Sequence, residues 1–357
     1  MNLAADLPCG PFAFGPSDSG PSAFSPPVRP LDSRFLATPL FSTSSASLHQ
    51  SSHPFRRVFL LMPANQVVHW SQDGHRPNVV ILGAPNRDRV RTELQRLRPV
   101  IADTANIVAE DLNFTYDFND QLVDLVIVLG GDGSILQAAR QMGMSQSPVL
   151  GINCGRLGFL AALSPDDFLN VWPEVMRGGS EVIDHIMFQV SVLRSGEVVA
   201  EQLALNEAAI LRGAPYRILD IDLYADGHLA TRYRCDGLII ATPVGSTAHN
   251  LSAGGPILRR NLQAIVISPI SPHTLTYRPV VDSAETVLEL TVTEPYDSTS
   301  VVVDGRILSA LQPGDRVRVE RAEQTFKMLE VPGQNDYRTL REKLGWGGSV
   351  NSKIGDD

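Results

Sequence analysis

The sequence is poor in cysteine, in long apolar runs and in positive charge. Its three cysteines, Cys9, Cys154 and Cys235, are too few and too scattered for a disulfide framework or a zinc site. No apolar run reaches the ~18 residues that a membrane span requires. The net charge of −9 argues against sequence-independent nucleic-acid binding, which needs a concentrated basic face. These absences favour a cytoplasmic protein with neither a membrane nor a nucleic acid as partner.

Residues 1–75 lack the periodicity of folded elements. The first 57 residues contain nine prolines and eleven serines but no lysine and no glutamate. Such a segment cannot bury enough apolar surface to offset its ordering entropy, so we expect residues 1–75 to be a disordered Ser/Pro-rich extension. The pattern of a secretory signal is absent, whereas an organellar transit peptide and a start codon placed too early stay open.

The segment Asp124–Arg140 is the most informative part of the chain. An unbroken apolar run at 125–129 is typical of a strand buried on both faces. It stops at the glycine-rich sequence GGDGS at 130–134, after which apolar residues recur at helical spacing. Such a strand–turn–helix presents backbone N–H groups and the positive end of a helix dipole, which suits phosphate.

Asp132 lies in the middle of this anion site, where a carboxylate is unfavourable unless it binds a metal or accepts a proton. The loop therefore indicates phosphoryl transfer. It is neither GxGxxG nor GxxxxGK[ST], so it predicts neither a Rossmann dinucleotide site nor a Walker loop. The alternative is that the glycines serve only the backbone conformation of the turn.

Strands and helices alternate on both sides of this segment. The pattern predicts an N-terminal Rossmann-like parallel α/β domain over residues 76–165, in which ligands bind beyond the carboxyl ends of the strands. Glycine-rich loops at 130–134 and 151–158 both follow strands and would lie together at that edge. The predicted elements are strands at 79–83, 100–107, 125–129 and 149–153 and helices at 87–97, 135–142 and 166–177.

After about residue 180 the pattern becomes one of short alternating runs. Turn signals such as Ser195-Gly196, Asp226-Gly227 and Asp304-Gly305 separate them. This predicts an all-β domain, a β-sandwich, over 166–335, followed by a C-terminal helix and tail at 336–357. The predicted runs are 188–193, 203–211, 218–224, 238–241, 264–267, 286–292, 301–304 and 315–319.

Two stretches of the β domain are too polar for simple strands. Asn206 and Glu207 place an amide beside a carboxylate, which a solvated strand face would also explain. The run DGLIIATPVGSTAHNLSAGGP at 236–256 is more specific. Its small residues and hydroxyls let a ligand approach the backbone and supply adaptable donors, so we expect a binding wall.

These motifs resemble the motif set of the NAD kinases. GGDGS, Asn206-Glu207 and the 236–256 run carry the resemblance, with lesser matches at INCGRLGFL (152–160), PHTL (272–275) and TLREKLGWGG (339–348). The resemblance covers about residues 78–348. It implies transfer of the terminal phosphoryl group of ATP to the 2′-hydroxyl of the adenosine ribose of NAD. The family architecture, an α/β domain followed by a β-sandwich, agrees with the layout above.

The resemblance also implies roles for individual residues. Asp132 matches the general base, with Gly133 beside it at the ligand. Asn206 and Glu207 match the pair that holds the riboses, and the wall around the adenine matches Thr247, Ala248, His249, Asn250, Leu251 and Ser252. Arg234 and Asp236 match positions at the nicotinamide end, with Arg217 at a further ligand position. An ionised aspartate can accept the proton of a ribose hydroxyl, which by itself is a poor nucleophile.

Two positions depart from the family pattern. His249 replaces a usual Tyr, and its ring stacks less extensively on adenine; Asn250 replaces Ser. Arg306, included among the ligand positions, stands where an uncharged Gln is usual. The implied cofactors and substrates are NAD, ATP or polyphosphate as donor, and Mg²⁺ or another divalent metal. A homo-oligomer, a dimer or tetramer, is implied as well.

Two other functions stay open at this point. A lipid or other small-molecule kinase of the diacylglycerol-kinase-like superfamily would share the GGDG loop, although the 236–256 run favours a nucleotide acceptor. A non-catalytic NAD(P)-sensing module would bind the dinucleotide without consuming ATP.

Overall fold

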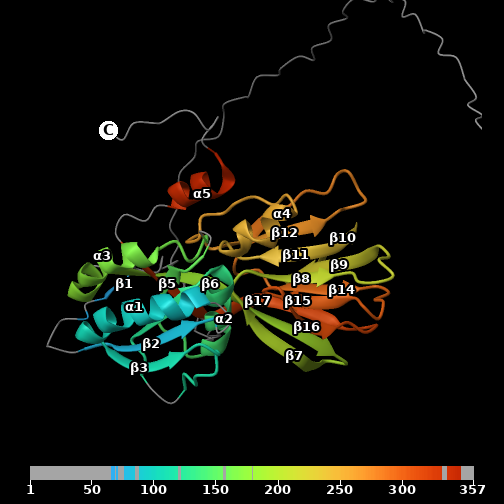
Figure 1. The fold of residues 1–357 in the computed structure, drawn as a ribbon. Coiled ribbons are helices and arrows are strands. Elements are labelled where there is room, and N and C mark those ends of the chain that lie inside the picture. Colours follow the sequence, from blue (N-terminus) through green and yellow to red (C-terminus); the bar gives the residue numbers. More distant parts are fainter. Residues whose placement is uncertain are drawn as a thin grey trace, which may run out of the picture. The chain divides into compact units, whose positions relative to one another are not determined.

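Four neighbouring parallel strands form the first part of the computed structural model (Figure 1). Their order across the sheet is β5 (Val149–Asn153), β4 (Leu125–Gly130), β2 (Asn78–Gly83) and β3 (Asn106–Asp111). Every residue of β4 and β5 is buried, as expected for strands between two layers of helices. The predicted parallel α/β sheet is confirmed.

The structure describes residues 66–68, 70, 76–84, 88–119, 122–155, 158–178, 180–331 and 336–346. These belong to one unit of the chain, Leu60–Asp357. The predicted disordered extension at 1–75 lies outside the described residues except at 66–68 and 70, where the structure has the strand β1 (Gln66–Val68) and a buried Trp70 in place of disorder. The tail after Trp346 also lies outside the described residues.

Each face of the parallel sheet meets different helices, because successive strand residues point to opposite sides. Val79 and Ile81 pack in one cluster with the buried faces of α1 (Asp88–Thr104) and α3 (Pro165–Arg177). Val80 and Leu82 pack in another cluster with α2 (Asp132–Met142). The helix that carries the glycine-rich loop therefore lies on the face opposite to α1 and α3.

The predicted strand at 100–107 is wrong over most of its length. Helix α1 continues through Thr104, and β3 begins only at Asn106. Leu94, Leu97 and Ile101 keep a helical spacing and are all buried, so the packing of this face outweighs the β-branched residues and the proline within it.

Beyond α3 the chain builds two antiparallel layers around one core. In the first layer, β17 (Arg316–Glu330) pairs with β5 and leads on to β14 (Leu288–Val292), β9 (Leu219–Ala225) and β10 (His228–Cys235). β6 (Ser180–Arg194) pairs along β17, and also with β7 (Glu197–Ala204) and β1 (Gln66–Val68).

The second layer has the order β13-β12-β11-β8-β15-β16. Its bounds are β13 Val280–Ser283, β12 Ala264–Ile270, β11 Gly237–Ala241, β8 Glu207–Leu211, β15 Ser300–Val303 and β16 Arg306–Ala310. Each predicted β run overlaps a strand, and the run at 203–211 is divided between β7 and β8, which belong to different layers. Four strands of the described residues, β1, β10, β13 and β16, lie wholly outside the predicted runs.

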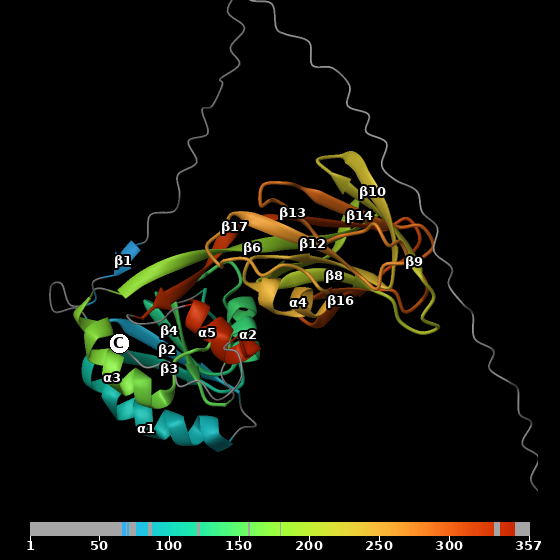
Figure 2. The same cartoon turned by 90° about the horizontal axis from the view of Figure 1, so that it is seen from above.

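The two regions share strands. β6 and β17, each 15 residues long, run from the parallel strands into the sandwich (Figure 2). The division near residue 165 stays a prediction, since one continuous sheet crosses it.

The predicted hairpin turns are present. Ser195, Asp226 and Asp304 have φ values of 54°, 49° and 46°, and each is followed by a glycine with positive φ. This is the backbone that two-residue hairpin turns require. The expected C-terminal helix is α5 (Asp336–Leu344).

Candidate functional site

Asp132 is placed by a junction of strand and helix. β4 ends at Gly130, Gly131 caps α2, and Asp132 is its first residue. The loop that follows the neighbouring strand β5 returns to this point, where the Cys154 N–H donates to the Gly130 carbonyl at 3.1 Å. The expectation that both glycine-rich loops meet at one sheet edge is confirmed for the described residues, which exclude 156–157.

The Asp132 carboxylate accepts three backbone N–H bonds. Phe159 donates to Oδ2 at 2.8 Å, and Leu160 and Ala161 donate to Oδ1 at 2.9 and 3.0 Å. A carboxylate offers about four lone-pair sites, so roughly one stays available to a substrate hydroxyl. We call residues 158–161 the nest loop. It fixes the carboxylate in one orientation before any ligand arrives.

An open hollow lies directly against the glycine-rich loop. Gly131, Gly133 and Ser134 form one side of it, and Arg306 lies at another. A side chain at Gly131 or Gly133 would meet nothing within 4 Å, so the backbone there is open to a ligand. Together with the start of α2, this arrangement suits a phosphate chain.

Asn206 and Glu207 lie where the chain crosses from one layer of the sandwich to the other. β7 ends at Ala204 in the first layer, and β8 starts at Glu207 in the second. Both polar residues are buried, with exposed fractions of 8% and 7%. The solvated strand face considered for this pair is therefore wrong.

Asp304, at the tip of the β15–β16 hairpin, fixes this crossover. Its carboxylate accepts the N–H groups of Leu205, Asn206 and Glu207 at 2.9, 2.8 and 3.1 Å. Its own N–H donates to the Glu207 carbonyl at 3.0 Å. The sequence analysis recognised Asp304 only as a turn residue, because nothing local indicates a contact almost 100 residues away.

The charges around the crossover belong to both parts of the fold. Burial and then the negative charge of Asp304 raise the pKa of Glu207 to about 8, although the His249 N–H acts in the opposite direction. Arg140 of α2 lies near Asp304 and Arg306; burial and then the charge of Arg306 lower its pKa. Helix α2 thus carries Asp132 in its first turn, and two turns later it carries Arg140, whose positive charge lies near Asp304 at the tip of the β15–β16 hairpin.

The raised pKa of Glu207 predicts a pH-dependent stability. The folded protein holds this proton up to about pH 8, whereas an unfolded glutamate releases it near 4.5. The stabilisation is therefore complete below the unfolded pKa and is lost as the pH rises through about 8, by up to about 1.4 kcal/mol per pH unit. Urea unfolding from pH 5 to 9 should show this decline in the wild type relative to Glu207→Gln; parallel curves would contradict it.

The segment 242–256 divides into inward and outward residues. Thr242 and Ser246 are fully buried: the Thr242 hydroxyl donates to the Leu205 carbonyl of the crossover, and the Ser246 hydroxyl donates to the Pro243 carbonyl within the segment, both at 2.6 Å. Asn250 is also fully buried: its amide donates to the carbonyls of Ser246 and Pro256 at 3.0 Å and accepts from Ser268 at 2.6 Å. The polar atoms of the Asn250 side chain thus bond within the protein and shape the loop, while its expected place in the wall stays a prediction. His249 and Ser252 are exposed, and Thr247, Ala248 and Leu251 are half-buried.

This segment contacts the crossover closely. The Thr242 N–H donates to the Asn206 carbonyl at 2.9 Å. A Cβ at Gly245 would lie 2.0 Å from that same carbonyl oxygen, so only glycine fits there. The expected ribose pair and the expected wall therefore form one surface.

Arg217, Arg234 and Asp236 lie at a different place. Asp236 precedes β11, paired with Arg212 at 2.7 Å, while Glu207 lies opposite Ala241 at the other end of that strand. A five-residue strand puts these ends roughly 15 Å apart. Arg234 is exposed near Asp220 at 3.9 Å, and Arg217 lies over the Tyr296 ring at 5.3 Å. Asp236 therefore lies at the far end of β11 from Glu207, and the ligand roles of these three residues stay predictions.

Two absences hold for the part of the chain that the structure describes. No group of three His, Cys, Asp or Glu side chains there could hold a metal ion. None of the helices in these ranges combines the length and the low polarity needed to cross a bilayer.

Comparisons with known proteins agree with this geometry. Residues 64–180 match the family model of the ATP-NAD kinase N-terminal domain, and residues 205–331 match that of the C-terminal domain. An NAD kinase of Rhodopirellula baltica is 69% identical over 281 residues, which cover 79% of this chain and 90% of the relative. An NAD kinase of Teredinibacter turnerae is 43% identical over 227 residues, covering 63% and 78% of the two chains.

Solved structures share the fold. Yeast NADH kinase complexed with NADH superposes with a TM-score of 0.67 at 23% identity, covering 82% of this chain and 94% of that one. An NAD kinase from Archaeoglobus fulgidus in complex with ATP gives a TM-score of 0.58 at 27% identity, covering 75% and 97%. Given the matches to both domain models and to the Rhodopirellula relative, the chain belongs to the NAD kinase family.

Proposed function

We propose that this chain phosphorylates the 2′-hydroxyl of the adenosine ribose of NAD, with ATP as donor and Asp132 as general base. The hydroxyl oxygen forms the new bond to the γ-phosphorus while the bond from that phosphorus to the bridging oxygen breaks. The hydroxyl proton passes to Asp132, and ADP leaves with the electron pair of the broken bond. The observation that supports this most directly is the ordered Asp132 carboxylate beside an open glycine-rich loop.

The other residues position the two substrates. We assign Asn206 and Glu207 to the riboses, because the pair lies against the small-residue segment 242–256. Gly131, Gly133 and Arg306 face the hollow in which the donor phosphates would lie. Proteins catalyse phosphoryl transfer mainly by such positioning of the substrates and by neutralising the phosphate charge.

A divalent metal fits this proposal only as an ion that is bound to the phosphates of the donor. The described residues offer no cluster for a dedicated ion, whereas Mg²⁺ commonly binds through substrate phosphates with one or two carboxylates. Such an ion would neutralise phosphate charge. We keep polyphosphate as a second candidate donor, because a phosphate chain without a base would also fit the glycine-rich side of the hollow.

A homo-oligomer is part of the proposal. Arg234 and Asp236 lie roughly a strand length from Glu207, so we infer that they serve a neighbouring subunit's site. A cytoplasmic location is proposed too: the two cysteines that the structure describes, Cys154 and Cys235, are buried as thiols and not joined in a disulfide, which suits a reducing compartment.

Replacing His249 with Tyr is expected to tighten NAD binding. The ring at position 249 is exposed on the proposed adenine wall, and a phenol covers a base more fully than an imidazole does. The KM for NAD should fall roughly 2- to 10-fold with kcat little changed. Steady-state kinetics at saturating ATP measure this, and an unaltered KM would place the adenine elsewhere.

Incubating the purified protein with NAD, ATP and Mg²⁺ tests the function itself. We expect stoichiometric NADP and ADP. ATP consumption without NADP would revive a lipid or other small-molecule kinase, to be checked with diacylglycerol as acceptor. NAD binding without ATP consumption would instead indicate a sensing module.

A further inference from the structure

The hollow at the glycine-rich loop has a further side that the proposed reaction leaves unused. Gly131, Gly133 and Ser134 form the side assigned to the donor phosphates, and Asn113 and Phe114 line the same hollow. The glycines follow β4, whereas Asn113 and Phe114 follow β3, and β2 lies between these two strands in the sheet. The hollow therefore extends over two strand spacings, roughly 10 Å. A nucleoside triphosphate with its terminal phosphate at the glycines could reach the far side with its nucleoside.

A buried carboxylate holds the segment after β3 in place. We call residues 112–116 the β3 loop. Asp111 is buried and accepts the N–H groups of three loop residues, among them Asn113 at 2.8 Å and Tyr116 at 2.7 Å. Gln141 of α2 donates to the same carboxylate at 3.1 Å and to the Tyr116 carbonyl at 2.9 Å. The helix that begins with the proposed general base thus also fixes the β3 loop.

Phe114 has an unusual backbone conformation in this loop. Its φ is 56°, in the left-handed region that bulky residues rarely adopt. Such a strained position is maintained only by its surroundings and is a common feature of ligand sites. The side chain is half-buried: it packs against the cluster that includes Val80 and Leu82, and it also lines the hollow. The ring is therefore held by the core and is accessible from the hollow.

The chemistry of the lining indicates which part of a donor lies here. An accessible aromatic ring is a surface on which a base stacks. The exposed amide of Asn113 can donate to and accept from the edge of an adenine, as asparagine does when it reads this base in DNA. Arg306 brings a guanidinium group to the same hollow, and guanidinium groups bind phosphate. A nucleotide would contact all three side chains, whereas a bare phosphate chain would leave Phe114 and Asn113 unused.

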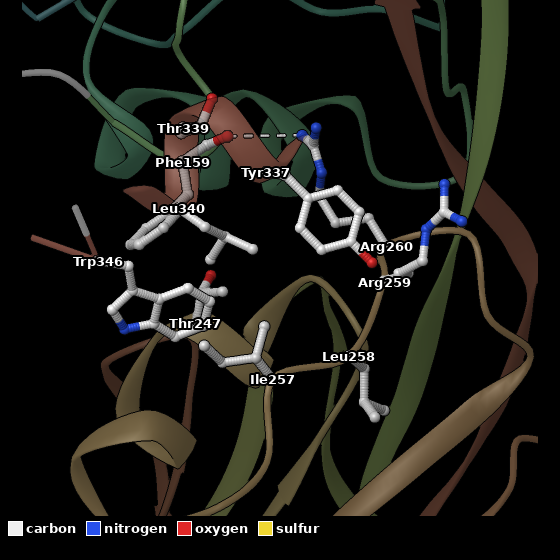
Figure 3. A pocket seen from close by; sticks show the side chains of 10 residues that line it. All are labelled: Phe159, Thr247, Ile257, Leu258, Arg259, Arg260, Tyr337, Thr339, Leu340 and Trp346. Atoms are coloured by element: carbon white, nitrogen blue, oxygen red, sulfur yellow. Dashed lines mark hydrogen bonds between the residues drawn. The ribbon is translucent and has the colours of Figure 1, made fainter. Parts of the chain in front are cut away.

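The base of the acceptor is assigned to another place. Figure 3 shows the pocket that helix α5 covers, where Phe159 of the nest loop and Thr247 of the proposed adenine wall lie together. Among the described residues, the linings of that pocket and of the hollow have no member in common. A base that reaches the β3 loop is therefore that of the donor.

We propose that the β3 loop binds the adenine base of the donor ATP, with Phe114 stacking on the base and the Asn113 amide bonding to its edge. This rests on the proposed function, in which ATP supplies the phosphoryl group. It also gives the chain a means to prefer ATP to polyphosphate, since a phosphate chain without a base gains nothing from the β3 loop.

Equilibrium binding to the full chain tests the site without turnover. The probes are a non-hydrolysable ATP analogue and inorganic tripolyphosphate, each with Mg²⁺. Phe114→Ala should weaken binding of the analogue by roughly 5- to 150-fold, the range for losing one aromatic stack on a base. Phe114→Leu keeps an apolar side chain against the core and should show most of this loss, whereas Phe114→Tyr should keep the affinity. Binding of tripolyphosphate should be the same in all four proteins.

Kinetics separate the donor from the acceptor. Phe114→Leu should raise the KM for ATP and leave the KM for NAD unchanged. Asn113→Ala should raise the KM for ATP by a smaller factor, roughly 2- to 12-fold, as expected for one hydrogen bond. Tyr116→Leu is the matched control, because Tyr116 is a half-buried aromatic residue of the same loop that packs against the same cluster but does not line the hollow. It should match the wild type in both KM values.

The outcomes distinguish this proposal from the function on which it rests. A wild type that makes NADP, with the same KM for ATP in Phe114→Leu as in Tyr116→Leu, overturns the donor-base site and leaves the function intact. A raised KM for NAD alone in Phe114→Leu also overturns it, because the base at the β3 loop would then be that of the acceptor. A protein that makes no NADP, but whose affinity for the ATP analogue falls in Phe114→Leu and not in Tyr116→Leu, overturns the function and leaves the site.

Discussion

Asp132→Asn is expected to lower kcat by roughly 10²- to 10⁴-fold, the usual contribution of a general base. The amide is nearly isosteric but cannot take the proton of the 2′-hydroxyl. Its oxygen can keep the bonds from Leu160 and Ala161, while its NH₂ would face the Phe159 N–H. NAD binding should therefore change by only a few-fold. Full progress curves of NADP formation and NAD titrations measure the two effects, and near-wild-type turnover would exclude Asp132 as the base.

Two further variants separate the base from its support. Asp315→Asn alters a buried carboxylate that also accepts three bonds, from Arg194 at 2.9 and 2.8 Å and from the Gln312 N–H at 2.8 Å. The Asp315→Asn variant should have a lower free energy of unfolding but an unchanged kcat.

Gly158→Ala places a Cβ 2.0 Å from the Asp132 Oδ1, so it should reduce kcat by displacing a carboxylate that is chemically intact.

Asp304→Ala is expected to give the second large effect, on both stability and NAD binding. It leaves the N–H groups of three buried residues, 205–207, without their acceptor. Allowing for partial rescue by water, the loss should be about 2–4 kcal/mol, or a Tm lower by roughly 4–16 °C. The KM for NAD should rise, because the ribose pair is no longer held.

The chain supplies a matched control for this prediction. Asp226 starts another Asp-Gly hairpin turn of the same kind, with a φ value of 49° against 46° for Asp304. Its carboxylate accepts the exposed N–H of Val287 at 3.0 Å, where Asp304 accepts three N–H groups. Asp226→Ala should change the Tm by no more than a few degrees and leave the KM unchanged. Equal effects of the two substitutions would mean that Asp304 matters only as a turn residue.

The parts of the site that the sequence reveals are those that local chemistry determines. GGDGS could be placed on a strand–turn–helix because a buried strand, glycines and a helical spacing follow one another within 20 residues. The hairpin turns were equally local, since Asp-Gly and Ser-Gly demand positive φ. The prediction ended helix α1 too early, because the β-branched residues near position 100 suggest a strand. In the structure the helix extends to Thr104, since Leu97 and Ile101 lie on its buried face.

The remaining features depend on contacts between distant segments. The three N–H donors of the nest loop lie 27–29 residues after Asp132, and Asp304 accepts bonds from residues 97–99 positions earlier. Neither bond leaves a periodic signal. The separation of Asp236 from Glu207 follows from the direction of β11, and the burial of Asn250 follows from its bond to Ser268. Helix α5 could be predicted as a helix but not as the cover of a pocket.

A crystal structure with NAD and a non-hydrolysable ATP analogue tests the central claim most directly. The account predicts the 2′-oxygen of the adenosine ribose within about 2.6–3.2 Å of the Asp132 carboxylate, or joined to it by one water, with the γ-phosphate against Gly131 and Gly133. A 2′-oxygen beyond the reach of one bridging water, with both substrates bound, would contradict it.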